Sequence, residues 1–237
     1  MPRFTPSVLI SDCWGSVGDL TFYHVDGRCY FKKKNQCEFP GTDAQNSQLD
    51  VHRRALAAWR TLEHSVQLTW NALAEPVISH KPPFDNTAHI SGQNLFVSAY
   101  HGFYTLGDEH VPYPQAWQKF PVHSLDFEDA AVDGSDLRLC FHSYFPETEP
   151  AGRYQVLSRI QLTKPGYGRN QGHMRNFLAD APCDSGDGRV CIVVDDFRRR
   201  WDLDLDEYQV HGRYVLLDRQ TGYRNIPREF SFSMKLV

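Results

Sequence analysis

The stretch DLRLCFHSYF, Asp136–Phe145, has the composition of a β-strand and lies in the second half of the chain. Four strand-like runs follow it, separated by clusters of Gly, Pro and Asp: RYQVLSRIQLT, RVCIVVDDF, YQVHGRYVLLDRQ and REFSFSMKLV. The segment DRQTGYR predicts a tight turn between the last two runs. Because no helical pattern separates these runs, about five to seven strands are expected to form an antiparallel β-sandwich.

The start of the chain predicts a β-hairpin. LTFYHV (Leu20–Val25) and RCYFKK (Arg28–Lys33) flank an Asp-Gly pair, which is typical of a two-residue type I′ turn. Alternation places Phe22 on one face of the hairpin and Tyr23 on the other. Since both faces carry large apolar groups, we expect the hairpin to be covered on both sides, by its own domain or by a neighbouring one.

Between the hairpin and the strand-rich half, the spacing of apolar residues predicts three short helices. The first helix is expected to begin at Asn46 or Ser47, and the third at Ser91, a residue suited to an N-cap. The second is expected within VQLTWNALAE. The predicted fold is therefore mainly β with a helical insert, in the α+β class.

A proline-containing segment, GDEHVPYPQAWQKFPVH, separates the helical and strand-rich parts and is the expected domain boundary. We predict a hairpin-plus-helices domain over residues 1–108, a linker over 109–120 and a β-sandwich domain over 121–237.

Charge and hydropathy exclude several classes of protein. The 237 residues include 25 Lys and Arg and 29 Asp and Glu, a net charge of −4, and neither half of the chain is basic. Nucleic-acid binding is therefore not expected. The N-terminus lacks the apolar run of a signal peptide, and no stretch has the roughly 20 apolar residues that cross a bilayer. We expect a protein of the cytoplasm or of a particle built there, such as a virion, with no membrane contact.

Six cysteines leave the redox state open. Cys29 and Cys37 are separated by seven residues, and so are Cys183 and Cys191, but pairing cannot be deduced from spacing alone. With no sign of export, we expect free and mostly buried thiols, and keep these two disulfides as alternatives.

Three motifs follow one another in the helical part. The first is W-x-x-L, the second W-N-x-x-A and the third S-G-x-N-L-F, and their residues are Trp59, Leu62, Trp70, Asn71, Ala74, Ser91, Gly92, Asn94, Leu95 and Phe96. This block, with the hairpin before it, resembles a family of largely uncharacterised bacterial and prophage-associated proteins. The resemblance implies a fibronectin- or immunoglobulin-like β-sandwich in the second half and an association with surface or particle structures.

Read from the residues themselves, the same block predicts packing rather than ligand binding. Trp59 and Trp70 are expected to anchor a small helical core, and Leu62, Asn71 and Phe96 belong to the same structural motif. Gly92 and Asn94, at the start of a helix, suit a close backbone approach and capping hydrogen bonds.

The catalytic and metal-binding motifs in the sequence are incomplete. CDSGDG predicts a turn, because the context of a serine-protease triad is missing. DLDLDE predicts a short strand with Asp202, Asp204 and Asp206 on its solvent face; a calcium loop is the alternative. The histidines form no zinc motif. We therefore predict no catalytic residue, no metal and no cofactor.

Two segments are candidate interaction sites. The loop GYGRNQG and the residues after it contain Arg169 and Arg175, and loops of this kind often carry the binding residues of a sandwich. In the hairpin, Lys32, Lys33 and Lys34 end the second strand. These lysines are expected either to keep a solvated strand edge from aggregating or to contact an acidic partner together with Phe22 and Tyr23.

These observations predict a non-enzymatic structural or adaptor component of a phage or phage-like particle, with protein subunits as partners. The alternatives are a glycan- or protein-binding β-sandwich module and a hydrolase whose active site matches no motif.

Overall fold

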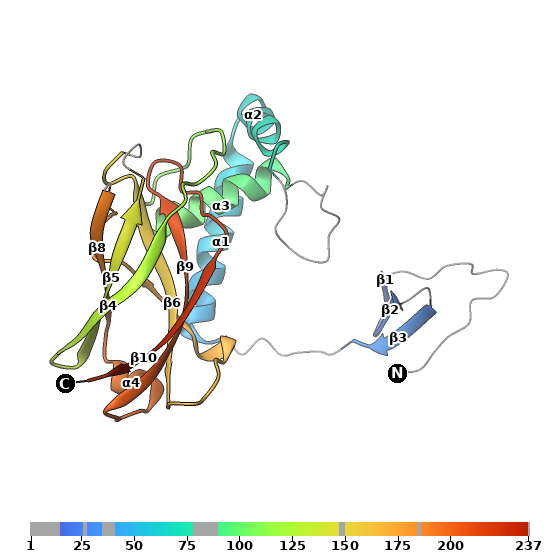
Figure 1. The fold of residues 1–237 in the computed structure, drawn as a ribbon. Coiled ribbons are helices and arrows are strands. Elements are labelled where there is room, and N and C mark those ends of the chain that lie inside the picture. Colours follow the sequence, from blue (N-terminus) through green and yellow to red (C-terminus); the bar gives the residue numbers. More distant parts are fainter. Residues whose placement is uncertain are drawn as a thin grey trace. The chain divides into compact units, whose positions relative to one another are not determined.

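The computed structural model describes residues 15–25, 28–34, 41–77, 90–146, 150–183 and 186–236. Its contacts divide the chain into two compact units, Met1–Asn46 and Ser47–Val237. Four α-helices and three antiparallel sheets lie in the described residues (Figure 1), so the fold is mainly β with helices, as predicted. None of the helices in these residues has both the length and the apolar composition needed to cross a bilayer.

The N-terminal unit contains a three-stranded sheet. Its strands are β1 (Gly15–Val17), β2 (Leu20–Val25) and β3 (Arg28–Lys33), in the order β1-β2-β3. The hairpin of β2 and β3 is confirmed, with Val25 paired to Arg28; the two turn residues between them lie outside the described residues. The short strand β1 was not predicted.

Three helices follow. They are α1 (Asp43–Thr61), α2 (His64–Ala74) and α3 (Gly92–Thr105). Helix α3 begins as predicted, because the Ser91 side chain accepts a hydrogen bond from the Asn94 N–H at 3.2 Å. Helix α1 begins earlier than predicted. Thr42 and Gln45 exchange side chain–backbone hydrogen bonds of 3.2 and 3.4 Å, the reciprocal arrangement of a capping box.

The helices share a small apolar core. Trp70 is fully buried against Phe96, and Trp59, only partly buried, packs on the same ring at 5.5 Å. Gly92 lies so close to Asn71 that a Cβ at this position would overlap its backbone and side chain. The Asn71 Oδ1 accepts the Gly92 N–H at 3.2 Å, which explains why an Asn and a Gly occupy these two positions.

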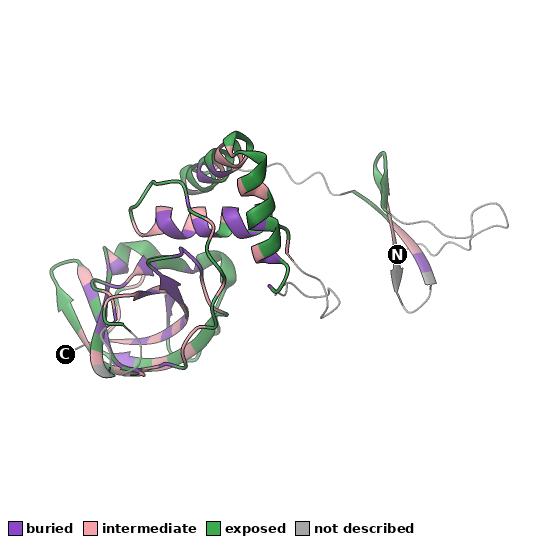
Figure 2. Cartoon of the chain, turned by 90° about the horizontal axis from the view of Figure 1, so that it is seen from above, coloured by how far each residue is buried: buried purple, intermediate pink, exposed green. Residues whose placement is uncertain are grey.

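The second half forms two antiparallel sheets with the strand orders β10-β9-β6-β7 and β4-β5-β8. The buried residues of these strands face one another and form the main core (Figure 2). The strand bounds are β4 Ser124–Asp133, β5 Asp136–Phe145, β6 Tyr154–Thr163, β7 Arg175–Leu178, β8 Gly186–Val194, β9 Glu207–Asp218 and β10 Arg228–Lys235.

Three features of this half differ from the sequence prediction. Strands β4 and β7 were not predicted; β4 carries several Asp and Glu residues and β7 has only four residues. A short helix, α4 (Phe197–Trp201), interrupts the strands between β8 and β9. The predicted strand over Asp202–Asp206 is wrong: Asp202 has a left-handed backbone, φ 53°, and ends α4, so the chain turns there.

Helix α3 packs directly on the β9–β10 connection. A Cβ on Gly102 would overlap the carbonyl of Gly222, which itself has φ 71°. The Arg224 guanidinium donates to the His101 carbonyl and the Thr105 hydroxyl, at 3.1 and 2.9 Å, near the C-terminus of α3. Residues 109–120, the predicted linker, thus lie inside one compact unit. That the residues before and after this segment fold as separate domains stays a prediction.

The expectation of free thiols is wrong for two cysteines. Cys140 on β5 and Cys191 on β8 are directly opposite in the register and form a disulfide. This bond also excludes a Cys183–Cys191 pair, and Cys183 is buried in the sandwich core. Cys37, one member of the other pair considered, lies outside the described residues. The strand register, which the sequence does not reveal, decides the pairing.

Candidate functional site

In the N-terminal unit, aromatic pairs lie on both faces of the small sheet. Phe22 packs across the strands on Phe31, with ring centroids 6.2 Å apart, and Tyr23 stacks on Tyr30 at 5.9 Å. All four rings are half-buried. The three lysines are exposed, and the Lys32 ammonium lies 5.6 Å from the Tyr23 ring. The predicted interaction residues of the hairpin are thus together on adjacent strands.

The predicted loop residues Arg169 and Arg175 lie apart. Arg169 forms an ion pair with Glu229 on β10, at one edge of the four-stranded sheet, whereas Arg175 begins β7 at the other edge. The loop between them is fixed to the sheet, because the Asn170 N–H donates to the Gln161 side chain at 2.7 Å. The Asn170 side chain accepts the Gly172 N–H and caps a 3-10 turn, η1 (Gln171–His173).

Between these two arginines, the outer side of the sheet carries rows of polar residues from β6, β9 and β10, which we call the polar face. The inward residues of the same strands form the sandwich core, so alternation directs the others outward. The register aligns three rows: Arg159, Arg213 and Glu229; Gln161, His211 and Ser231; Thr163, Gln209 and Ser233.

Hydrogen bonds connect these rows. The His211 Nε2 lies 2.9 Å from the Tyr167 carbonyl and must donate to it, which leaves Nδ1 of the neutral ring as the acceptor for the Ser231 hydroxyl at 3.1 Å. Gln209 donates to the Ser231 Oγ at 2.9 Å and accepts from Ser233 at 2.6 Å. Above them lies an open cavity of about 390 Å³, lined by Arg169, His211, Glu229, Phe230 and Ser231.

The Ser231–His211 pair has the donor–acceptor order of a nucleophile and its general base. Three features favour a binding role for it instead. A carbonyl rather than a carboxylate orients the imidazole, the Ser231 Oγ already accepts from Gln209, and Ser231 lies in mid-strand. The polar face can thus offer hydroxyl, amide, imidazole and guanidinium groups to a polar ligand.

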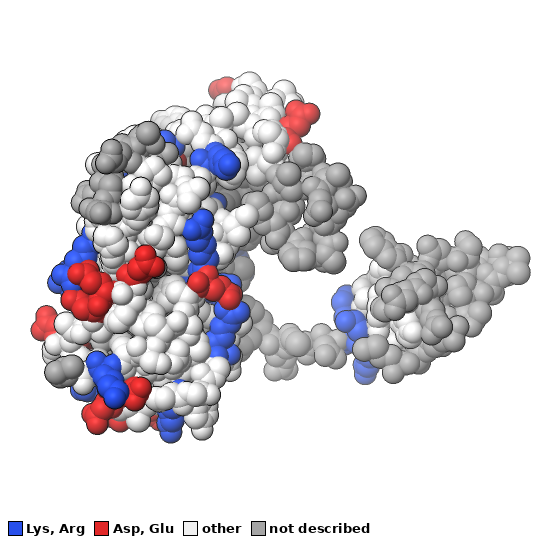
Figure 3. Space-filling view, in the orientation of Figure 1, with Lys and Arg blue, Asp and Glu red and all other residues white. Residues whose placement is uncertain are grey.

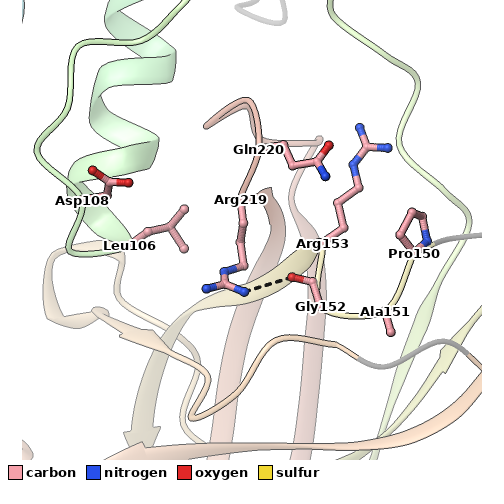
Figure 4. Close-up of a pocket in the computed structure, with 8 residues that line it drawn as sticks. All are labelled: Leu106, Asp108, Pro150, Ala151, Gly152, Arg153, Arg219 and Gln220. Atoms are coloured by element: carbon pink, nitrogen blue, oxygen red, sulfur yellow. Dashed lines mark hydrogen bonds between the residues drawn. The ribbon is translucent and has the colours of Figure 1, made fainter.

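A second cavity, of about 350 Å³, lies between the end of α3 and the loops of the sandwich. Figure 4 shows Arg219 between Leu106 and Gly152, whose carbonyl accepts from the Arg219 Nη1 at 3.0 Å. Asp108 also lines this cavity, and its hydrogen bonds with His110 lower its pKa. The cavity is therefore lined by two arginines, Arg153 and Arg219, and one carboxylate, without a serine or cysteine nucleophile among its lining residues.

Basic and acidic side chains alternate over the face that Figure 3 displays, without a broad area of one sign. This distribution gives no electrostatic support for nucleic-acid binding. In the part of the chain that the structure describes, which includes Asp202–Asp206, no group of three or more His, Cys, Asp or Glu side chains could hold a metal ion.

No protein-family model matches this sequence, and no curated protein is significantly similar to it. Three solved structures of OgpA from Akkermansia muciniphila align with part of this chain. The catalytically inactive form, in complex with an O-glycopeptide (glycodrosocin) substrate, aligns with a TM-score of 0.31 and 15% identity over 51% of this chain and 32% of that chain. Two crystal forms of wild-type OgpA align with a TM-score of 0.29 each and 14% and 17% identity, covering 50% of this chain and 29% and 30% of theirs. The match thus spans about a third of the OgpA chain.

Most residues of the polar face were not predicted. Alternation in YQVHGRYV and REFSFSMK does place Gln209, His211 and Arg213 on one side of a strand, and Glu229, Ser231 and Ser233 on one side of another. What the sequence lacks is the register, which brings these sets together and adds Arg159 from β6.

Proposed function

We propose that this protein is a non-enzymatic structural or adaptor component of a multi-subunit assembly, of the kind found in phage or phage-like particles. The observation that supports this role most directly is the unpaired edge of the small sheet in the N-terminal unit. In the described residues, β3 pairs with β2 alone, so its other edge presents main-chain N–H and C=O groups to a further strand.

The composition of this sheet also supports an intermolecular role. It has one strand of three residues and two of six, a size that is marginal without a packed face. Two of its apolar side chains are exposed, Val17 at 72% and Leu20 at 38%. A partner strand beside β3 would add backbone hydrogen bonds, and acidic groups on that partner would meet Lys32, Lys33 and Lys34.

The disulfide supports a particle over the cytoplasm. Cytosolic reductants keep thiols reduced, whereas disulfides persist on virions and in other oxidising surroundings. The Cys140–Cys191 bond therefore fits the virion better than the other location that the sequence predicts.

Sedimentation velocity over a wide range of concentrations tests the assembly. We expect the wild-type chain to self-assemble, or to assemble with its neighbouring subunits, and Val17→Asp to abolish this because it places a charge on the exposed apolar patch. Val122→Asp is the matched control: Val122 is also 72% exposed but lies in the other unit, so this variant should assemble normally. Reversing the charge of the three lysines should weaken assembly most at low salt, where screening is least.

Two results would contradict the proposal. One is a wild-type protein that stays monomeric at every concentration and with every candidate subunit, while the amides of Leu20–Lys33 exchange slowly. The other is a Val17→Asp variant that assembles like the Val122→Asp control.

A glycan- or protein-binding module is the second candidate function. The cavity on the polar face favours it, together with the nearby Tyr167, which is 65% exposed and lies on the loop whose carbonyl orients His211. Binding that Ser231→Ala weakens, with assembly unchanged, would support this role.

A further inference from the structure

Two arginines lie directly opposite each other on the polar face. Arg159 on β6 and Arg213 on β9 are paired in the register, and both are half-buried. Directly opposite residues on one face place their Cβ atoms about 4.5–5.5 Å apart, and like charges in that position destabilise a sheet. A fold with this pair therefore holds an unfavourable contact in its unliganded state.

In the part of the chain that the structure describes, only Arg213 of this pair has a carboxylate opposite it, and that carboxylate belongs to another ion pair. In the described residues, neither Arg159 nor Arg213 forms an ion pair, and Glu229, opposite Arg213 on β10, is paired with Arg169 instead. Arg175 begins the edge strand β7 opposite the core residue Ile160, and from this edge it adds a third positive charge beside Arg159. Burial, and then repulsion from Arg213 and Arg175, lowers the pKa of Arg159, which is the direction expected for uncompensated positive charge.

Backbone carbonyls hold two of the three guanidinium groups in place. Arg159 donates to the Gln171 carbonyl at 2.9 Å. Arg175 donates to the carbonyls of Gly172 and Met174 at 2.9 and 3.1 Å. All three carbonyls belong to η1 and the residue after it, which Asn170 anchors to the sheet. The two cations are thus fixed before any ligand binds, while the third, Arg213, makes no such bond in the described part of the chain.

We propose that Arg159, Arg175 and Arg213 form a binding site for a phosphate or sulfate group on the outer side of the β9-β6-β7 sheet. Guanidinium groups present planar forks of N–H donors that match the oxygens of such anions. Three cations suit a tetrahedral oxyanion better than a carboxylate, because a carboxylate has only two oxygens to share among them. The anion would replace the repulsion between β6 and β9 with attraction to both strands.

The site goes beyond the proposed function and does not rest on it, since it lies in the other unit and involves none of the assembly residues. The site implies that the polar face binds a molecule bearing a phosphate or sulfate group. The rest of that molecule would extend toward His211 and Ser231.

Titration of the intact protein with inorganic phosphate and, separately, with sulfate tests the site. The arginine Nε–H signals are followed by NMR, with sodium chloride at matched ionic strength as the reference. We expect the signals of Arg159, Arg175 and Arg213 to shift with at least one of the two anions and not with chloride. A response to phosphate alone, or to sulfate alone, identifies the group that the natural ligand carries.

Arg159→Gln and Arg213→Gln should each weaken binding about tenfold, the effect of losing one charged hydrogen bond. Arg138→Gln is the matched control, because Arg138 lies on the other sheet in an ion pair with Asp180 at 3.3 Å, and it should leave binding unchanged. The proposal fails if chloride shifts the three signals as strongly as phosphate and sulfate do. It also fails if the two glutamine variants bind as tightly as the control. The wild-type titration decides the question even if a variant does not fold.

Discussion

The two outer faces of the β-sandwich differ in how far their arginines are paired with carboxylates. On the β4-β5-β8 sheet, Arg189 contacts both Glu128 and Asp129, and Arg138 contacts Asp180, so each arginine there has a carboxylate. All of these groups except Glu128 line a cavity of about 400 Å³, which the Cys140–Cys191 disulfide also lines. On the β10-β9-β6-β7 sheet, Arg159 and Arg213 face each other, and neither forms an ion pair in the residues that the structure describes.

On the first face, the charges of the arginines are balanced by carboxylates of the same chain, whereas on the second face two arginines lack such a partner in the described residues. On the first face, ion pairs form between side chains of the protein itself, and a disulfide joins two of its strands. On the second face, Arg169 is paired with Glu229, whereas Arg159 and Arg213 form no ion pair in the described residues, and there we propose that an anion binds. Three measurements test this difference between the faces, and they follow in order of decreasing expected effect.

The disulfide should give the largest effect. Replacing both Cys140 and Cys191 with Ala should lower the free energy of unfolding by about 2–5 kcal/mol, the usual cost of losing a native disulfide. Chemical denaturation measures this loss, and reduction of the wild-type protein should reproduce it. Hydrogen exchange should accelerate more in β5 and β8 than in β6 and β9. Equal acceleration in both sheets would show that the two faces are not mechanically distinct.

Acidification should have the next largest effect, because it acts on the core that both sheets share. His123 contacts the rings of Phe145 on β5 and Tyr214 on β9, and burial lowers its pKa to about 4. Between pH 6.5 and 4, the unfolded chain therefore binds a proton that the folded chain does not. Stability should be full above pH 6.5 and fall by about 3 kcal/mol as the pH approaches 4.

Urea denaturation across this pH range measures the His123 effect, with His123→Phe as the comparison. The Phe ring can occupy the same aromatic contacts without titrating, so this variant should lose most of the pH dependence. A variant as pH-sensitive as the wild type would assign the effect to other groups.

The smallest effect is expected from removing a single positive charge, which should change the free energy of unfolding in opposite directions on the two faces. Arg213→Gln removes the repulsion with Arg159 and should stabilise the unliganded protein by roughly 0.2–1 kcal/mol at low salt. Arg189→Gln, on the opposite face, should destabilise it, since its two carboxylates lose their partner. Denaturation at low and high salt measures both variants, and salt should reduce both changes. Destabilisation by Arg213→Gln at low salt would mean that Arg213 is already compensated.

Local signals were sufficient to predict much of the fold. An Asp-Gly pair between two aromatic runs gave the β2–β3 hairpin, and Ser91 gave the start of α3. Strong strand patterns gave β5, β6, β8, β9 and β10. Strand β4 was missed because its acidic residues conceal the apolar side of an edge strand. Helix α1 was predicted to start too late because the roles of Thr42 and Gln45 were not recognised.

The candidate site was less predictable than the fold. Arg169 and Arg175 were selected from the composition of one loop, yet the structure places them at opposite edges of the sheet. Arg159 and Arg213 are separated by more than fifty positions in the sequence, and only the β6–β9 register makes them neighbours. The Cys140–Cys191 bond depends on the β5–β8 register in the same way. Register is a property of the whole sheet, so no local pattern contains it.

The contact of α3 with the β9–β10 connection has a consequence for synthesis of the protein. Tyr223 completes the small core around Trp70 and Phe96, and Arg224 occupies carbonyl and hydroxyl groups near the end of α3. A ribosome makes these two residues more than a hundred positions after α3, so the helices leave the exit tunnel before the residues that cover them exist. The nascent chain must keep an apolar helical surface exposed until the β9–β10 connection is made, and a message truncated before the codon for Tyr223 would encode a protein that never buries this surface.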